Sequence, residues 1–169
     1  MEYTTVYEVT NETLDIILAV PVLLAIGGFW IFYRTFQKNK NEGRKSKDYF
    51  SLYFGLTFAA IFSIVSIVRI SNSINKLRET KQIFLNGNFK TVEGKIENYE
   101  PMPYTGHEDE RFTINGIEFN YSDFSASYYG FHNSASHGGP IKENGQEVRI
   151  GYFTRDDGHN TILKIGLKK

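Results

Sequence analysis

The sequence predicts a membrane protein of the α+β class: a two-helix transmembrane hairpin with a helical stalk, followed by a small antiparallel β barrel or curled sheet. Two long uncharged runs, a helical spacing of apolar residues after the second run, and an alternating pattern beyond it predict this order. The 169 residues contain 19 basic and 19 acidic side chains, so the whole-chain average hides these segments. The lack of cysteine excludes disulfides and thiol chemistry.

The two uncharged runs have the length of membrane-spanning helices. Residues 16–33 give 18 positions without a charge, and residues 49–68 give 20. A bilayer core about 30 Å thick needs roughly 20 apolar helical residues. We therefore predict transmembrane helices at residues 14–36 and 49–70, after an N-terminal tail at residues 1–13. Two buried helices of a soluble bundle are the alternative, although such helices are usually shorter and carry a polar stripe.

The first run could instead belong to a signal peptide cleaved near Ala25-Ile26-Gly27. A signal peptide begins with basic residues, whereas residues 1–15 contain four acidic and no basic side chains. The apolar run also continues past that point, from Phe29 to Tyr33. A retained transmembrane helix therefore explains the sequence better.

Charge predicts the orientation of the hairpin. Residues 34–48 carry six basic and two acidic side chains, and the loop between the spans is expected at residues 37–48. Because basic residues accumulate in cytoplasmic loops, we expect this loop in the cytoplasm and both termini outside. Four basic residues after the second span favour the opposite orientation: Arg69, Lys76, Arg78 and Lys81. The runs hold no ionisable residue, which argues against a transporter.

Small residues form a stripe at every fourth position of the second span. They are Ser51, Gly55, Ala59 and Ser63. Such a stripe lets two helix backbones approach closely. Ala25 and Gly28 could meet it within one hairpin. Alternatively, the stripe is a seam between copies of this chain or with a partner membrane protein.

A helical spacing of apolar residues continues beyond the second span, from Ile67 to Phe84. The second helix is therefore expected to run on as an amphipathic stalk over residues 71–86. Gly87 suits the left-handed residue that ends many helices. The β domain then occupies residues 87–169.

A period of two predicts five strands in the β domain. Asn115-Gly116 between two alternating runs predicts a hairpin with a type I′ turn, which pairs Ile114 with Ile117 and Phe112 with Phe119. The other strands are expected at residues 91–99, 147–153 and 161–167. Gly94 marks a bulge or a bend in the first of these. Five short strands are typical of a small barrel or curled sheet, OB-like at loosest.

The long segment from residue 122 to residue 146 is the candidate binding region. Long loops are usually functional or disordered, and the many rings argue against disorder. The loop is either a folded cover for the β domain or a surface for a ligand or partner, because Tyr, Ser and Gly form adaptable recognition surfaces. The candidate binding residues are Phe124, Tyr128, Tyr129, Phe131, His132, His137, Gly138 and Gly139.

The sequence offers no motif for catalysis, a cofactor or a metal. Hydrolase, phosphate-loop and dinucleotide motifs are absent, and the adjacent Ser136 and His137 do not make a catalytic pair. The four histidines lack the spacing of metal ligands. Gly138-Gly139 forms either an anion-binding backbone turn or simply a tight turn. Because residues 71–169 carry 12 basic and 13 acidic side chains, a nucleic acid polymer is not an expected partner.

Four segments of the β domain resemble a group of uncharacterised small bacterial membrane proteins. They are Gly106-His107, Phe112-Thr113-Ile114-Asn115-Gly116, Phe119-Asn120-Tyr121-Ser122-Asp123 and Ser136-His137-Gly138-Gly139-Pro140-Ile141. The resemblance covers residues 87–167 and implies no activity. The layout is also similar to two-transmembrane β-barrel effectors of bacterial cyclic-nucleotide defence systems. That similarity implies a β domain that binds a nucleotide second messenger and spans that damage the membrane.

Two functional hypotheses follow. In the first, a non-enzymatic protein of the plasma (inner) membrane crosses the lipid bilayer twice, and its exported β domain binds a protein or envelope partner. In the second, an oligomeric effector perturbs the membrane when its β domain binds a ligand such as a nucleotide second messenger. The second hypothesis needs the β domain in the cytoplasm and the small-residue stripe between copies of the chain.

Overall fold

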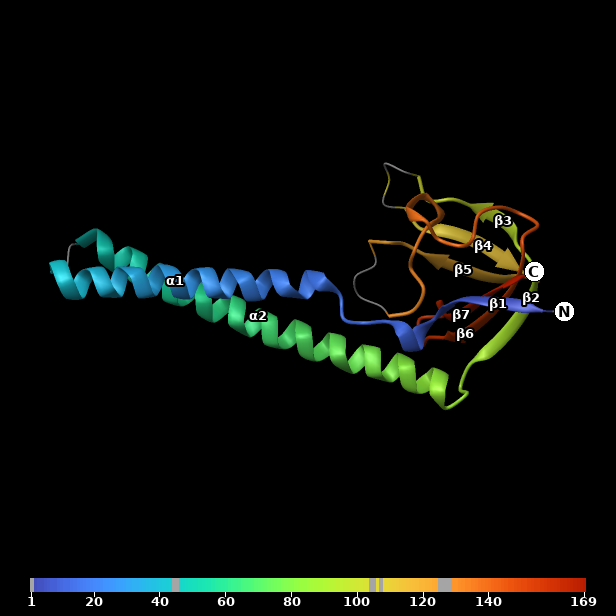
Figure 1. Cartoon of the computed structure of the whole chain (residues 1–169), viewed down its shortest axis with the longest axis horizontal. Helices are drawn as coiled ribbons and strands as arrows, with labels where there is room; N and C mark the ends of the chain where they lie inside the picture. The colour runs from blue at the N-terminus through green and yellow to red at the C-terminus, as the bar shows by residue number, and fades with distance from the viewer. Residues whose placement is uncertain (1, 44–45, 104–105, 107, 125–128) are drawn as a thin grey trace. The chain divides into compact units, whose positions relative to one another are not determined.

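The computed structural model describes every residue except 1, 44–45, 104–105, 107 and 125–128. The chain forms two compact units (Figure 1). Residues 14–75 form a helical unit, and residues 1–13 together with 76–169 form a β unit. The fold is therefore α+β, with two long apolar helices and antiparallel sheets. Tyr128, one of the predicted binding residues, lies outside the described residues.

The helical unit is a hairpin of two long helices, and the last part of the second helix, from Lys76 on, belongs to the β unit. Helix α1 spans Ala19–Glu42 and helix α2 spans Ser46–Leu85. The second predicted span and its stalk thus form one continuous helix of 40 residues. Part of the predicted loop at residues 37–48 is helical, because α1 continues to Glu42 and ends only where Gly43 has a positive φ of 80°. The bounds of the loop were predicted from its basic side chains. Residues 37–42 contain no glycine or proline that would stop a helix, so α1 continues through them.

Helices α1 and α2 contact each other at glycine. A Cβ added at Gly28 would lie 2.7 Å from the backbone nitrogen of Ala59, and one at Gly55 would lie 2.8 Å from the nitrogen of Phe32. Ala25 is also buried. Gly55 and Ala59 of the predicted stripe therefore pack within the hairpin, while Ser51 and Ser63 are half-buried.

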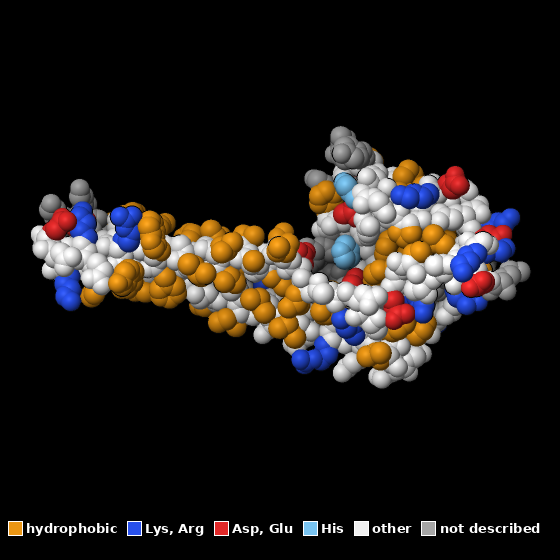
Figure 2. All heavy atoms as spheres, viewed as in Figure 1, with side chains coloured by type: hydrophobic (Ala, Val, Ile, Leu, Met, Phe, Trp, Pro, Cys, Tyr) orange, Lys and Arg blue, Asp and Glu red, His pale blue; other side chains and the backbone are white. Residues whose placement is uncertain are grey.

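Most apolar side chains of both helices are exposed. Only 17% of the most apolar stretch of each helix is buried, whereas a core helix of a soluble protein would be mostly covered. Figure 2 shows hydrophobic side chains over much of both helices and basic side chains near the end where they meet. By length and composition, both helices are able to cross a membrane.

The β unit contains two antiparallel sheets. The larger sheet has the order β1-β7-β6-β2, and the smaller has the order β3-β4-β5. The strand bounds are Tyr3–Glu8 for β1, Lys90–Lys95 for β2, Glu97–Glu100 for β3, Glu110–Ile114 for β4, Ile117–Tyr121 for β5, Glu147–Thr154 for β6 and Asn160–Lys168 for β7.

The sheets do not close into a barrel, so that part of the prediction is wrong. The single strand expected at residues 91–99 breaks at Ile96, where the backbone bonds leave the sheet: its N–H donates to Gln146 and its carbonyl accepts from Gly145. Strand β2 therefore stays with β6 while β3 pairs with β4. This break separates the two sheets.

The N-terminal tail is a second difference from the expected organisation. Residues Tyr3–Glu8 form the edge strand β1, which pairs with β7 from Tyr3–Lys168 to Glu8–Lys164 (Figure 1). Its β-branched and aromatic residues favour a strand. The prediction for this segment used only its acidic charge. No pattern among neighbouring residues indicates that its partner strand lies at the far end of the chain.

The Asn-Gly hairpin is confirmed. Asn115 and Gly116 have positive φ values of 51° and 78°, and the predicted Phe112–Phe119 and Ile114–Ile117 pairs form. Gly94 has a different role from the expected bulge. Its pairing with β6 is regular, and an added Cβ would lie 2.9 Å from Ile114 Cγ2, so glycine permits a close approach of the hairpin.

The core of the β unit combines both sheets with the long loop. Phe112, Phe119 and Ile150 are buried with Phe131 and Ile141 of the segment 122–146. Helix α2 ends in a Schellman turn, in which Asn88 N–H donates to Ile83 O at 3.0 Å and Gly87 N–H donates to Phe84 O at 3.1 Å. The predicted glycine cap is therefore confirmed.

Candidate binding cleft in the β unit

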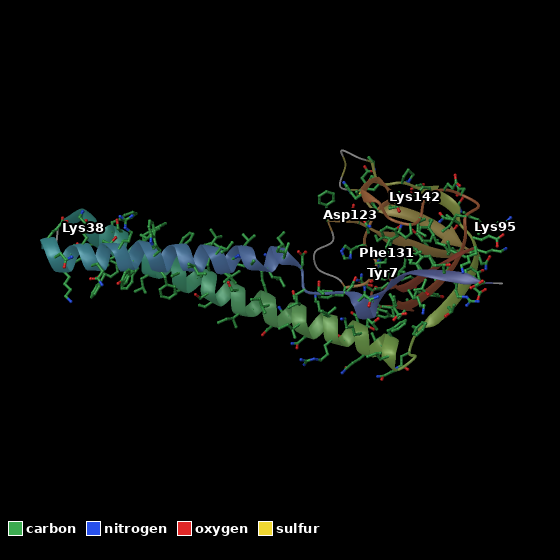
Figure 3. The ribbon with its side chains drawn as sticks, in the orientation of Figure 1. Tyr7, Lys38, Lys95, Asp123, Phe131 and Lys142 are labelled. Carbon is green, nitrogen blue, oxygen red and sulfur yellow. The ribbon has the colours of Figure 1, made fainter. Side chains whose placement is uncertain are left out.

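Phe131 anchors the long loop to the core. Its ring centroid lies 5.0 Å from that of Tyr7 and 4.9 Å from that of Tyr121, both in edge-on contacts. Figure 3 labels Phe131 and Tyr7 in the β unit. Its N–H donates to Ile162 O at 2.9 Å. Phe131 is 7% exposed. This part of the loop is therefore a folded cover, as one of the two sequence interpretations expected.

Asp123 ties a second part of the loop. The Ser134 hydroxyl donates to Oδ2 at 2.5 Å and the Ser134 N–H donates to Oδ1 at 2.6 Å. His137 Nδ1 contacts the same carboxylate. Ser136 Oγ lies 3.5 Å from that same ring nitrogen, whereas a catalytic triad places the acid and the serine on opposite nitrogens. The cluster therefore holds the loop together.

Burial raises the pKa of Asp123, but the bonds from Ser134 and the contact with His137 outweigh burial and hold this pKa below its ordinary value of 3.8. We expect Asp123→Ala to lower the free energy of unfolding by about 2 kcal/mol at neutral pH, because the N–H and hydroxyl of buried Ser134 lose their acceptor. A depressed carboxyl pKa stabilises the fold above the unfolded-state pKa, and this contribution disappears as pH falls through the folded-state pKa. Urea unfolding from pH 7 down to pH 2 measures the difference.

The exposed Asp156 provides the control for this variant. Asp156→Ala should change the free energy of unfolding by less than about 0.5 kcal/mol at any of these pH values. A gap between Asp123→Ala and the native protein that stays constant down to pH 2 would contradict the assigned role.

Gly138 and Gly139 form a tight turn. Gly138 has a positive φ of 97°, and its N–H donates to Ala135 O at 3.2 Å. The Gly139 N–H donates to Ser134 O at 2.8 Å, and an added Cβ there would overlap the carbonyl oxygen of Asn133. Since both N–H groups already have acceptors, this turn does not offer the anion-binding backbone considered from the sequence.

Glu110 is a buried acid that is not among the predicted binding residues. Tyr121 donates its hydroxyl to Glu110 Oε1 at 2.5 Å, and Ala135 N–H donates to Oε2 at 2.9 Å. Burial, followed by the charge of Glu110, raises the pKa of Tyr121 and of Tyr99. Glu110 thereby links strands β4 and β5 to the long loop. In the sequence it is only the last acid of a short acidic run.

A cleft of about 190 Å³ opens beside the anchored loop. Tyr129, Phe131 and His132 of the predicted binding residues line it, together with side chains from β5, β7 and the β6–β7 turn. Phe124 is 54% exposed and lies outside the lining, as do His137, Gly138 and Gly139. The polar lining residues include Asp109, Asn120, His132, Arg155, His159, Asn160 and Thr161.

The charges of the cleft are closely balanced. Arg155 forms a fork with Asp157, with Nε–Oδ1 at 3.3 Å and Nη2–Oδ2 at 2.9 Å. Asp109 accepts a bond from Asn120 Nδ2 at 3.2 Å. Burial and then the charge of Arg155 lower the pKa of His159, which disfavours the charged form of this ring. The described lining residues therefore give no strong net charge.

The segment before α1 supports the back of the cleft. Glu12 accepts bonds from the Tyr7 hydroxyl at 2.7 Å and from Gly130 N–H at 3.2 Å, next to His132. Burial raises the pKa of Glu12. Lys81 of α2 donates to the carbonyl oxygens of Thr10 and Glu12 at 2.8 and 2.7 Å. Residues far apart in the sequence thus fix the position of Gly130.

Comparisons of the chain with protein-family models, with curated proteins and with solved structures find no match. The function is therefore argued from the residues of the cleft and the helices.

Proposed function

We propose that the chain is a membrane-anchored, non-enzymatic binding protein whose β unit recognises a partner through the cleft beside Tyr129. The observation that carries the proposal is the cleft itself. The half-buried ring of Tyr129, on the anchored loop, lines this cleft together with several hydrogen-bonding side chains of other segments. The described lining residues include no activated nucleophile of the kind that covalent catalysis needs. A binding function needs only the hydrogen bonds and the ring contact that these lining residues offer.

Membrane anchoring by both helices is part of this proposal. The exposed apolar surface of α1 and α2 supports insertion, because a soluble protein rarely exposes so much apolar surface. The pairing of β1 with β7 supports two crossings, since strands that pair must lie on the same side of a membrane. It also favours a retained α1, because cleavage near Ala25 would detach β1 from the anchor. The basic side chains around the α1–α2 connection favour an exported β unit.

The small-residue stripe bears on the effector hypothesis. That hypothesis places the stripe between copies of the chain, whereas Gly55 and Ala59 pack against Gly28 and Phe32 of the same chain. The effector function is therefore not the one we propose.

A photo-cross-linking amino acid placed at position 129 tests the binding function. In intact bacterial cells we expect adducts between this variant and a partner, because the half-buried Tyr129 ring lines the cleft. The same substitution at Tyr3, a half-buried tyrosine of β1 that does not line the cleft, serves as the matched control. Equal adduct yields at both positions, or none at position 129, would contradict recognition through the cleft.

An experiment on intact cells also tests on which side of the membrane the β unit lies. Because the chain has no native cysteine, a single Phe124→Cys variant reacts specifically with maleimide. An exported β unit predicts labelling by a membrane-impermeant maleimide before lysis. Labelling only after lysis would place the β unit in the cytoplasm.

A further inference from the structure

We infer that the cleft binds one unit of a neutral sugar, as part of a glycan. This inference rests on the proposed binding function and specifies its ligand class. The size of the cleft, the chemistry of its lining, its charge balance and the arrangement of its rings each bear on the choice.

The size of the cleft suits a single six-membered ring. Its volume is about 190 Å³. An engineered apolar cavity of about 150 Å³ in another protein binds benzene. The cleft is therefore large enough for one pyranose ring and too small to enclose a whole dinucleotide or a folded peptide.

The lining suits a ligand with many hydroxyl groups. Arg155 brings donors only, Asp109 brings acceptors, and the amide of Asn120 brings both. A sugar hydroxyl donates one hydrogen bond and accepts others, so it can satisfy all three kinds of partner. An apolar ligand would remove water from these polar groups and offer no hydrogen bond in its place, which is unfavourable.

The charge balance argues against a phosphorylated ligand. The guanidinium of Arg155 is already forked to Asp157, and Asp109 places a carboxylate in the cleft wall. Phosphate sites in proteins usually combine several donors with net positive charge. A neutral ligand does not need a site with net positive charge, so the balanced charges of this cleft suit it.

The arrangement of the rings argues against a stacked nucleobase. Phe131 and Tyr121 are almost fully buried and pack edge-on against each other at 4.9 Å, so they do not form two open parallel faces. Tyr129 is half-buried and is the most accessible tyrosine or phenylalanine ring of the described lining. One ring is enough to cover the apolar C–H face of a pyranose.

Saturation-transfer NMR on the full chain in lipid nanodiscs, prepared without sugar-based detergents, tests the inference. The probes are the methyl glycosides of glucose, galactose, mannose and N-acetylglucosamine, with AMP and a neutral dipeptide for comparison. We expect at least one glycoside to bind, with an affinity independent of salt because the ligand is neutral. Tyr129→Ala and Asp109→Ala should each weaken binding about tenfold or more, whereas Tyr3→Ala should leave it unchanged.

Each other result overturns the sugar assignment in a recognisable way. Salt-sensitive binding of AMP that is lost in Tyr129→Ala would make the ligand a nucleotide, and binding of the dipeptide would make it a peptide. Glycoside binding that survives both cleft variants would place the sugar elsewhere. If no glycoside binds but cross-links form at position 129, only the ligand class is wrong. If cross-links are also missing, the proposed function fails as well.

Discussion

Glu110→Ala is expected to lower the free energy of unfolding of the β unit by about 2–4 kcal/mol. The variant removes the acceptor of the buried Tyr121 hydroxyl and of the Ala135 N–H, and an unpaired buried donor costs about 1–3 kcal/mol. It also leaves a small cavity where the fully buried Glu110 side chain lies. Urea unfolding followed by the near-ultraviolet circular dichroism of the tyrosines measures the loss.

Glu118 is the matched control for this experiment. It lies on the neighbouring strand β5, its side chain is exposed, and it belongs to the same hairpin. Glu118→Ala should change the free energy of unfolding by less than about 0.5 kcal/mol. Equal losses for Glu110→Ala and Glu118→Ala would show that the buried acid does not hold the loop to the hairpin.

Gly28→Ala is expected to destabilise the helical hairpin by about 1–3 kcal/mol, because the new methyl group would meet backbone atoms of Ala59 and Gly55 that cannot move independently. The adjacent Gly27 gives an unusually close control, since an added Cβ there has nothing within 4 Å. Gly27→Ala should therefore be neutral or slightly stabilising, because alanine favours helix.

Energy transfer across the hairpin measures this effect. The chain lacks native cysteine, so dyes can be attached at single cysteines that replace the exposed Phe29 and Ile61. We expect the transfer efficiency in nanodiscs to fall on heating at a lower temperature in Gly28→Ala than in the parent. A temperature that is unchanged in Gly28→Ala, or lowered equally in Gly27→Ala, would contradict direct contact at Gly28.

Features encoded by neighbouring residues could be predicted from the sequence. The Asn115-Gly116 turn, the register of its hairpin and the end of α2 at Gly87 each depend on a few consecutive side chains. The strand β1 could not be predicted in this way, because its partner β7 lies at the opposite end of the chain. The break at Ile96 was missed for a similar reason, since it depends on bonds to Gly145 and Gln146.

The residues of the cleft also differ in whether the sequence could predict them. Tyr129, Phe131 and His132 were predicted because they cluster in one ring-rich loop. Asp109, Asn120 and Arg155 come from three separate segments and share no spacing that would mark them as one site. The buried Glu110 was missed because a short acidic run is usually solvated, and only the fold shows that its last member lies inside.

The pairing of β1 with β7 also determines when the β unit can form during synthesis. Strand β7 lies between β1 and β6, so a nascent chain that has not yet reached residue 160 lacks the strand that joins the larger sheet. Both helices have been synthesised by then, and the first strand has waited unpaired throughout. Such long-range pairing is slow and leaves strand edges open to aggregation. Assembly of the β unit therefore comes after synthesis of both helices, and the early β1 segment is a part that needs protection until β7 has been made.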